Sequence, residues 1–435
     1  MAKQIPLPLK YPIPDNWKWV EMDTLVFMRS GFPFDSGKFS TEHEGRMPLI
    51  RIRDVVRGET ATFTDENCPD EYIIHSGDVL IGMDGDFNVA KWKSEDALLN
   101  QRVCYICSSS NALLNDYLFY YLPDPLKKIN DATPSVTVKH LSTKTLGKTS
   151  IPLPPLAEQQ RIVDQIESLF SKLDEAKEKA QAVVDGFEDR RTMILHKAFT
   201  GELTAIWRRA HNVSEETWEV LTLNDVADYK KGPFGSSITK AMFVPKGEHT
   251  YKVYEQGNAI RKTLDYGHYY INEQKYNELK GFVVQAGDII ISCAGTIGEV
   301  YKLPEGCEAG VINQALMRVR LHPNIEERFF SYYFGEVIKG DVIDQANGTA
   351  IKNIPPFKVM KAMEIRLPSL AEQKAIVDLL DEMLRKEEQA QETAENVIDQ
   401  IDELKKSILA RAFRGELGTN DPADESAEEL LKRIL

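Results

Sequence analysis

A block of about fifty residues occurs twice in this chain, at a constant offset of 214 positions. The first copy opens with Leu-Pro-Pro-Leu-Ala-Glu-Gln at 153–159 and closes with Ala-Phe-Thr-Gly-Glu-Leu at 198–203. The second opens with Leu-Pro-Ser-Leu-Ala-Glu-Gln at 367–373 and closes with Ala-Phe-Arg-Gly-Glu-Leu at 412–417. This period is far longer than that of solenoid repeats. The sequence therefore predicts a duplicated domain-plus-helix unit with internal pseudo-twofold symmetry.

Each copy of the repeat predicts one long helix of about 43 residues, roughly 65 Å in length. Ser369 and Glu372 match a capping box, and Gly201 and Gly415 follow the final Phe, where a C-terminal glycine is typical. Apolar residues recur at sevenfold spacing in two rows on each helix, which is the pattern of a coiled-coil seam. The alternative is two unrelated surface helices, each packed on its own domain. The predicted seam comprises Ile162, Ile166, Leu169, Leu173, Val183, Phe187, Ile376, Leu380, Met383, Val397, Ile401 and Leu404.

Charged residues interrupt this seam at three positions. Glu387 breaks the second helix, and Arg190 and Arg411 fall on seam positions towards the helix ends. Ala176, Ala180, Ala390 and Ala394 place small side chains on the seam, and we expect the two helices to lie close together at that level.

The regions before the helices are rich in β-branched residues and resemble each other only faintly. Short apolar runs separated by Gly-Asp turns, with one helical stretch in each region, predict mixed α/β (α+β) domains dominated by a curved sheet. The fold class expected is therefore two β-rich domains separated by two long helices packed as an antiparallel coiled coil. The predicted boundaries are 1–155 and 217–370 for the two domains, 156–216 and 371–417 for the helical regions, and 418–435 for an acidic tail with a short helix.

Composition indicates an ordinary soluble protein, with 42% hydrophobic and 28% charged residues. No run approaches the roughly 18 apolar residues of a membrane span, and no signal peptide is recognisable, so we expect a cytoplasmic location and no membrane partner. The net charge of −14 at first argues against a nucleic-acid partner. However, residues 371–435 alone hold 17 acidic and nine basic side chains. The two domains can therefore still present basic faces.

Motifs for chemistry are nearly absent. The five cysteines (68, 104, 107, 293 and 307) are expected to be reduced thiols, and Cys104 and Cys107 lie in a predicted strand without a second pair at zinc spacing. Two P-loop-like stretches, at 31–39 and 142–149, each lack a required residue. No methyltransferase, nucleophile-elbow or zinc-protease motif is found. Asp84 and Asp86 are interpreted as turn residues, so we expect no catalytic residue and no metal site.

The paired Leu-Ala-Glu-Gln openings and Ala-Phe-x-Gly-Glu-Leu endings resemble the repeated regions of the specificity subunits of type I restriction–modification enzymes. The resemblance covers essentially the whole chain, because motif, order and spacing all recur twice. It implies two target recognition domains, each reading one half of a bipartite double-stranded DNA sequence, with the helices setting the unread spacer. It also implies a non-catalytic chain whose helices dock two methyltransferase subunits, and which assembles with restriction (motor) subunits.

The resemblance further implies that S-adenosylmethionine, ATP and Mg²⁺ act through those partner subunits, with no cofactor in this chain. Two alternatives remain at this point. One is a duplicated coiled-coil scaffold that binds proteins without reading DNA. The other is the specificity subunit of a modification-only methyltransferase.

Residues for DNA contact are predicted in loops that carry basic and small polar side chains. Arg can read guanine and Asn adenine through paired hydrogen bonds, whereas Lys mostly binds phosphate. Lys139 and Lys352 occupy the same motif in the two domains and are the strongest pair. The candidates are Lys38, Arg51, Arg53, Lys91, Lys93, Lys139 and His140 in the first domain, and Lys230, Lys231, Ser236, Arg261, Lys262, Thr349, Lys352 and Asn353 in the second.

Overall fold

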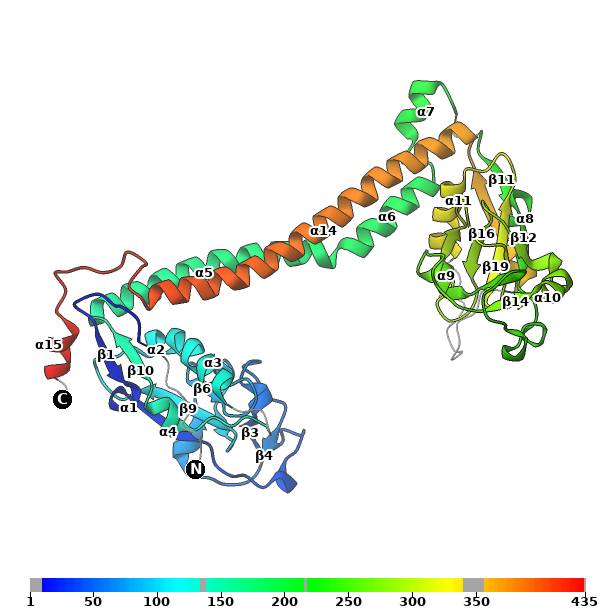
Figure 1. Ribbon diagram of the computed structural model, residues 1–435. Helices are drawn as coiled ribbons and strands as arrows, with labels where there is room; N and C mark the ends of the chain where they lie inside the picture. The colour runs from blue at the N-terminus through cyan, green and yellow to red at the C-terminus, as the bar shows by residue number, and fades with distance from the viewer. Residues whose placement is uncertain (1–9, 134–137, 215–216, 339–355, 434–435) are drawn as a thin grey trace. The chain divides into compact units, whose positions relative to one another are not determined.

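A computed structural model of the chain describes residues 10–133, 138–214, 217–338 and 356–433. The chain forms two compact units, Met1–Gln181 with Glu395–Leu435, and Ala182–Ala394. Each unit contains one sheet-rich domain together with parts of the long helices (Figure 1). The expected mixed α/β fold with two β-rich domains and long helices is confirmed.

The domain of the first unit is built from two four-stranded sheets and a strand pair. One sheet has the order β2-β9-β6-β7 and the other β4-β3-β8-β5, while β1 pairs with β10. All pairings are antiparallel except that between β3 and β8. The strands are β1 (Lys18–Glu21), β2 (Val26–Ser30), β3 (Met47–Ile50), β4 (Phe63–Thr64), β5 (Ile73–Ile74), β6 (Val79–Gly82), β7 (Val89–Lys91), β8 (Ala97–Leu99), β9 (Val103–Ser108) and β10 (Ser150–Leu153).

The domain of the second unit repeats this topology strand for strand. Its sheets have the orders β12-β19-β16-β17 and β14-β13-β18-β15, β11 pairs with β20, and the β13–β18 pairing is parallel. The predicted duplication of a domain-plus-helix unit is therefore confirmed. The strands are β11 (Glu219–Thr222), β12 (Ala227–Lys231), β13 (Thr250–Tyr254), β14 (Tyr270–Asn272), β15 (Val283–Val284), β16 (Ile289–Ser292), β17 (Val300–Lys302), β18 (Gly310–Ile312), β19 (Leu316–Leu321) and β20 (Glu364–Leu367).

Matching turns and helices complete the two domains. Gly77 and Gly287, with φ of 95° and 87°, form the predicted Gly-Asp turns in front of the fully buried strands β6 and β16. Only glycine adopts such a φ without strain. The predicted helical stretches are α2 (Asn115–Tyr121) and α11 (Glu327–Tyr333), and the tail forms α15 (Ala427–Lys432).

The second repeat forms one helix, α14 (Leu370–Ala412), but the first is divided. Its parts are α5 (Leu156–Asp185) and α6 (Phe187–Phe199), separated at Gly186 with φ −83° and ψ 1°. The expectation of one uninterrupted first helix is therefore wrong. The cause is local: Arg190 folds back and donates to the Val183 carbonyl at 2.8 Å. A Cβ at position 186 would lie 2.6 Å from the Nη1 atom of Arg190, so a larger residue there would displace this guanidinium.

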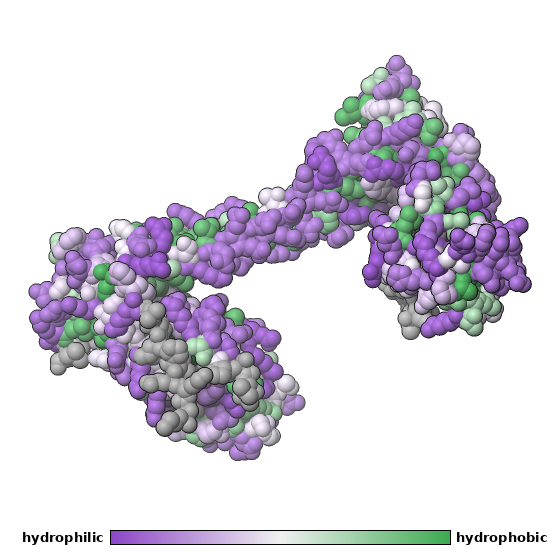
Figure 2. Space-filling view, viewed as in Figure 1, coloured by the Kyte–Doolittle hydropathy of each residue, from purple (hydrophilic) through white to green (hydrophobic). Residues whose placement is uncertain are grey.

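Ion pairs within the first unit show that α5 and α14 run antiparallel. Lys177 binds Asp402 at 2.6 Å, and Lys405 binds Asp174. Next to the Lys177–Asp402 pair, Ala180 and Ile401 are buried. The visible face of the helices in Figure 2 is mostly hydrophilic, as expected for helices that bury one narrow stripe.

The predicted seam is buried unevenly. Ile162 and Ile166 are fully buried in one domain core, and Ile376 and Leu380 in the other. Leu169, Leu173, Val183, Phe187 and Met383 are half-buried, whereas Val397 and Leu404 remain 37% and 50% exposed. The ends of the helices thus pack on their domains, as the alternative interpretation required, while their middle parts pair with each other.

Two charged residues that interrupted the predicted seam bind each other. Arg190 donates from Nε to Glu387 at 2.6 Å within the second unit. Both side chains are half-buried, and the bond also fixes the guanidinium that crosses the break at Gly186. The apparent flaws in the pattern therefore form a specific contact.

In each repeat, the Glu of the Leu-Ala-Glu-Gln motif connects the helix to its domain through a hydrogen bond. Glu158 accepts a hydrogen bond from the Trp17 indole at 2.9 Å, and Glu372 accepts one from the Trp218 indole at 3.0 Å. Both carboxylates are fully buried. The predicted capping box is therefore incomplete: Ser369 accepts from the Glu372 amide at 3.3 Å, but the carboxylate binds the domain instead of returning to the helix start.

The repeated Gln makes an equivalent joint in each unit. Gln159 donates from Nε2 to the Ala112 and Pro154 carbonyls and accepts from the Leu114 amide. Gln373 donates to the Asn324 and Pro368 carbonyls and accepts from the Glu326 amide. Each side chain thus satisfies backbone groups at the start of α2 or α11. The motif recurs because a buried amide must be fully hydrogen-bonded at this joint.

The Ala-Phe-x-Gly-Glu-Leu endings pack beside the opening motif of the other repeat. Phe413 packs edge-to-face on Tyr117 and Tyr121, and Phe199 packs in the same way on Phe329 and Tyr333. Gly201 and Gly415 have φ of 87° and 74°, which confirms them as C-terminal glycines. Each unit therefore combines the start of one repeat with the end of the other.

Candidate nucleic-acid interface

A loop after β2 lies directly against a second loop in the first domain. Phe32 donates to the Leu99 carbonyl at 2.8 Å, and the Gln101 amide donates to the Phe32 carbonyl at 3.0 Å. A Cβ on Gly31 would lie 2.2 Å from the Asn100 oxygen, so only glycine permits this approach. The result brings residues 32–40 beside the Asn100-Gln101-Arg102 turn.

Together these loops enclose a hollow of about 240 Å³. Its polar lining consists of side chains suited to hydrogen bonding with base edges or phosphates. Of the predicted residues, Arg51 lines the hollow with its guanidinium 5.6 Å from the Phe39 ring, and Lys38 is exposed on the adjacent 3₁₀ turn Ser36–Lys38. The lining residues are Phe34, Ser36, Phe39, Arg51, Ile52, Asn100, Gln101 and Arg102.

An acidic residue links the rim of this hollow to the predicted His140. Asp84 accepts from Arg102 Nη1 at 2.8 Å and lies 2.7 Å from His140 Nδ1. Asp84 was interpreted only as a turn residue, yet it orients two exposed side chains that can donate hydrogen bonds. His140 thus belongs to the same surface as Arg102.

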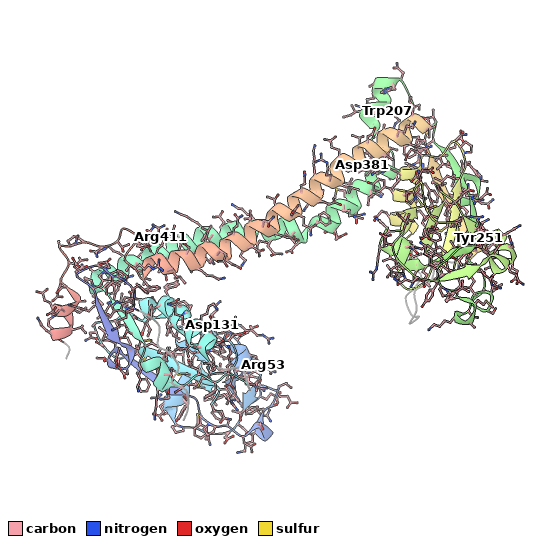
Figure 3. All side chains as sticks on the ribbon, in the orientation of Figure 1. Arg53, Asp131, Trp207, Tyr251, Asp381 and Arg411 are labelled. Atoms are coloured by element: carbon pink, nitrogen blue, oxygen red, sulfur yellow. The ribbon has the colours of Figure 1, made fainter. Side chains whose placement is uncertain are left out.

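The other predicted residues of the first domain bind internal partners or lie elsewhere. Lys139 donates to the Asn130 carbonyl at 2.7 Å and to its side-chain oxygen at 2.9 Å. Lys91 pairs with Asp116 at 2.7 Å. Arg53 donates to Thr62 Oγ1 at 3.4 Å and lies at the surface in Figure 3. Lys93 is exposed and covers Gly58. These residues do not line the hollow.

The second domain has the same loop contact. A Cβ on Gly232 would lie 1.8 Å from the Asn313 oxygen, and the Gly232 amide donates to the Leu316 carbonyl at 2.9 Å. Lys230, Lys231 and Ser236 are exposed on either side of this contact. The three predicted residues therefore lie close to this contact in the chain, with Lys230 and Lys231 directed to opposite faces of β12.

The remaining predicted residues of the second domain fall into two groups. Arg261 lies 5.0 Å from the Tyr266 ring, and Lys262 lines a separate polar hollow of about 450 Å³ that also contains Arg191 and Arg328. Thr349, Lys352 and Asn353 lie outside the described residues. The pairing of Lys139 with Lys352 thus stays a prediction.

Sequence reasoning missed Asn100, Gln101 and Arg102 as site residues, together with Asn313 and Gln314. The signal was present, since Asn-Gln recurs in both domains at 100–101 and 313–314. The loop contact at Gly31 and Gly232 that gives this pair its position is not visible in the sequence.

No group of three or more His, Cys, Asp or Glu side chains that could hold a metal ion occurs among the described residues. Cys104 and Cys107 lie on β9 as predicted, and all five cysteines are free thiols. Burial raises the pKa of Cys104 to about 12, so this thiol stays protonated at neutral pH. Within the described part of the chain, no helix has the length and apolar character to cross a bilayer.

The fold and the paired loop sites define a class: two recognition-type domains joined through duplicated helices. The family model for the type I restriction modification DNA specificity domain matches residues 14–184 and 215–399. The chain therefore belongs to the family of type I restriction–modification specificity subunits, which carry no catalytic centre of their own.

Several known proteins are similar to this chain over almost its whole length. The specificity subunit of the EcoBI type I restriction enzyme of Escherichia coli is 30% identical, covering 97% of this chain and 92% of that protein. The EcoKI specificity subunit of E. coli strain K12 is 21% identical, with coverage of 97% and 95%. The crystal structure of the HsdS subunit from Thermoanaerobacter tengcongensis has a TM-score of 0.58 at 19% identity and covers 94% of this chain and 99% of that one.

Proposed function

We propose that each domain of this specificity subunit reads one half of a bipartite double-stranded DNA target, while the helices set the spacer between the halves. The observation that carries the proposal is the identical loop contact in two domains of one topology, Gly31 on Asn100 and Gly232 on Asn313. The residues around the two contacts differ. The same scaffold can therefore present different reading surfaces.

In the first domain, Arg102 and Gln101 are exposed at the rim of the hollow and suit base edges, and Lys38 suits phosphate. In the second, Lys230 and Lys231 suit phosphate, and Asn313 and Gln314 take the positions of Asn100 and Gln101. The other predicted residues, including Lys139 and Lys352, complete the proposed interface. Lys139 keeps a third N–H for such a contact, because two serve Asn130.

The proposed partners are two adenine-methylating subunits and restriction (motor) subunits, which supply the binding of S-adenosylmethionine, ATP and Mg²⁺. The protein is expected to act in the cytoplasm, on the DNA of its own cell. Exposed Val397 and Leu404 on α14 offer apolar contacts for a methyltransferase subunit.

The test uses the purified chain with and without its methyltransferase partner. Mixed with S-adenosylmethionine and genomic DNA, the chain alone should transfer no methyl groups. With the partner present, sequencing should show N6-methyladenine in one split motif, with a methylated base in each half. Methyl transfer by the chain alone, or methylation without a split motif, contradicts the proposal.

A further inference from the structure

Phe234 stands out among the described residues because its side chain is 87% exposed, more than any other large hydrophobic side chain in the described part of the chain. Exposed single hydrophobic residues are common on protein surfaces. Phe234, however, is part of the loop that the Gly232–Asn313 contact fixes in place. Its exposure therefore belongs to the proposed reading surface.

The loop holds Phe234 outward by its own backbone. Pro233 in front of it is buried, and the Ser237 amide donates to the Phe234 carbonyl at 2.8 Å, closing the 3₁₀ turn Gly235–Ser237. Gly232 cannot move away without losing the bond of its amide to Leu316. The ring is thus presented on a short, anchored loop.

In the matching loop of the first domain, the aromatic side chains are buried or half-buried. Phe34 is only 4% exposed and packs on Phe32 at 4.9 Å, and Phe32 packs on Tyr72 at 5.4 Å. The same scaffold therefore buries an aromatic ring in one domain and exposes one in the other. The exposure in the second domain is not a requirement of the fold.

Basic residues close to Phe234 in the sequence indicate the ligand class. Lys230, Lys231 and Lys240 are exposed on the segments that flank the loop, so an anionic polymer is favoured at this surface. A phenyl ring cannot hydrogen-bond to phosphate. Its favourable contacts with duplex DNA are the methyl group of thymine in the major groove or a base step that the inserted ring partly unstacks.

From this geometry we propose that Phe234 is a specificity-determining residue that contacts a base of the second half-site through its ring. The inference rests on the proposed function, since it requires the second domain to read DNA. Lys230 and Lys231 would hold the adjacent phosphates, while the ring contributes sequence selection.

The experiment compares variants in the complete complex with the methyltransferase partner, on a duplex carrying the split motif methylated by the wild type. Phe234→Ala should weaken binding to this duplex about 10- to 100-fold, the range expected for loss of recognition at one base pair of a duplex site. Binding to a duplex of unrelated sequence, and its salt dependence, should stay unchanged. Phe234→Trp should retain wild-type affinity within a few fold.

Ile206→Ala is the matched control, because Ile206 is 80% exposed on the linker helix α7 (Ala205–His211) and lies outside the proposed interface. A second readout places 2-aminopurine at each position of the second half-site in turn. Its fluorescence should change on binding at one position with the wild type, and not with Phe234→Ala.

Equal affinity of Phe234→Ala and Ile206→Ala overturns the inference while the proposed function stands. If Phe234→Ala loses affinity equally for all DNA sequences and shows a smaller salt dependence, the inference is also overturned. The residue would then act through phosphate contacts. A wild-type complex that prefers no sequence overturns the proposed function and the inference together.

Discussion

At the scale of single residues, the most demanding position is the buried carboxylate of Glu372. It accepts from Arg208 at 2.8 Å, from Thr204 at 2.7 Å and from the Trp218 indole. Arg208 is itself only 5% exposed. Removing one partner of a buried ion pair leaves an uncompensated charge, which typically costs about 3–5 kcal/mol.

Glu372→Ala should therefore destabilise the second unit by about 3–5 kcal/mol, measured by urea unfolding. Glu403→Ala is the control, because the Glu403–Lys406 pair is 74% and 72% exposed and its loss should leave no resolvable change. Equal effects of the two substitutions would show that Glu372 does not hold the joint.

Glu158, the equivalent residue of the first unit, should make stability depend on pH. Burial raises the pKa of Glu158 above its ordinary value of 4.5, although the Trp17 indole and Arg161 oppose the shift. Between pH 4.5 and the raised pKa of Glu158, the folded state therefore binds more protons than the unfolded state. The free energy of unfolding consequently falls as the pH rises through this range. Gln stays neutral and can still accept from Trp17.

The free energy of unfolding of Glu158→Gln, relative to the wild type, should therefore increase as the pH is raised from below 4.5 towards neutrality. Urea unfolding at a series of pH values measures the difference between the two proteins. A difference that is constant with pH, or that decreases, is inconsistent with a raised pKa.

At the scale of elements, the sequence predicted the helices well where periodicity controls them. The span of α14, the two terminal glycines and the antiparallel pairing follow from apolar spacing and capping residues. The break at Gly186 does not follow from these patterns, because it depends on the Arg190 side chain folding back to Val183. The β-rich domains were predicted in class only, since strand pairing joins residues distant in the chain.

The small residues of the predicted seam offer a test of helix packing. Ala180 is buried on α5, whereas Ala176 one turn earlier is exposed. Ala180→Leu should lower the free energy of unfolding by about 1–3 kcal/mol through overpacking. Ala176→Leu adds the same atoms at an exposed position of the same helix and should have little effect. Urea unfolding that fails to separate the two variants would argue against close helix approach at Ala180.

The candidate site illustrates the same limit of prediction. Arg51 lines the hollow, Lys38 lies on the adjacent turn and His140 lies 2.7 Å from Asp84, whereas Lys91 and Lys139 bind Asp116 and Asn130. Residue type indicates which side chains can contact DNA. Which of them are free to do so depends on tertiary contacts that no local pattern encodes.

At the scale of the whole molecule, the duplication explains how one chain can contain two domains that are proposed to read DNA. Each unit has the same topology and the same Glu and Gln joint between domain and helix. The Glu and Gln residues of this joint are the same in both units, whereas the residues of the loops differ. A domain can thus change its reading surface without altering its attachment to the helices.

The domains should therefore be exchangeable, and the strand pair β11–β20 gives the boundaries. Replacing residues 219–367 by the corresponding segment of a relative transfers both strands together and keeps Trp218 and Glu372 in place. Sequencing of N6-methyladenine in DNA modified by the chimeric complex is the most direct measurement. The account predicts that one half of the split motif changes while the other half and the spacer remain. A motif in which both halves change, or in which neither does, would contradict it.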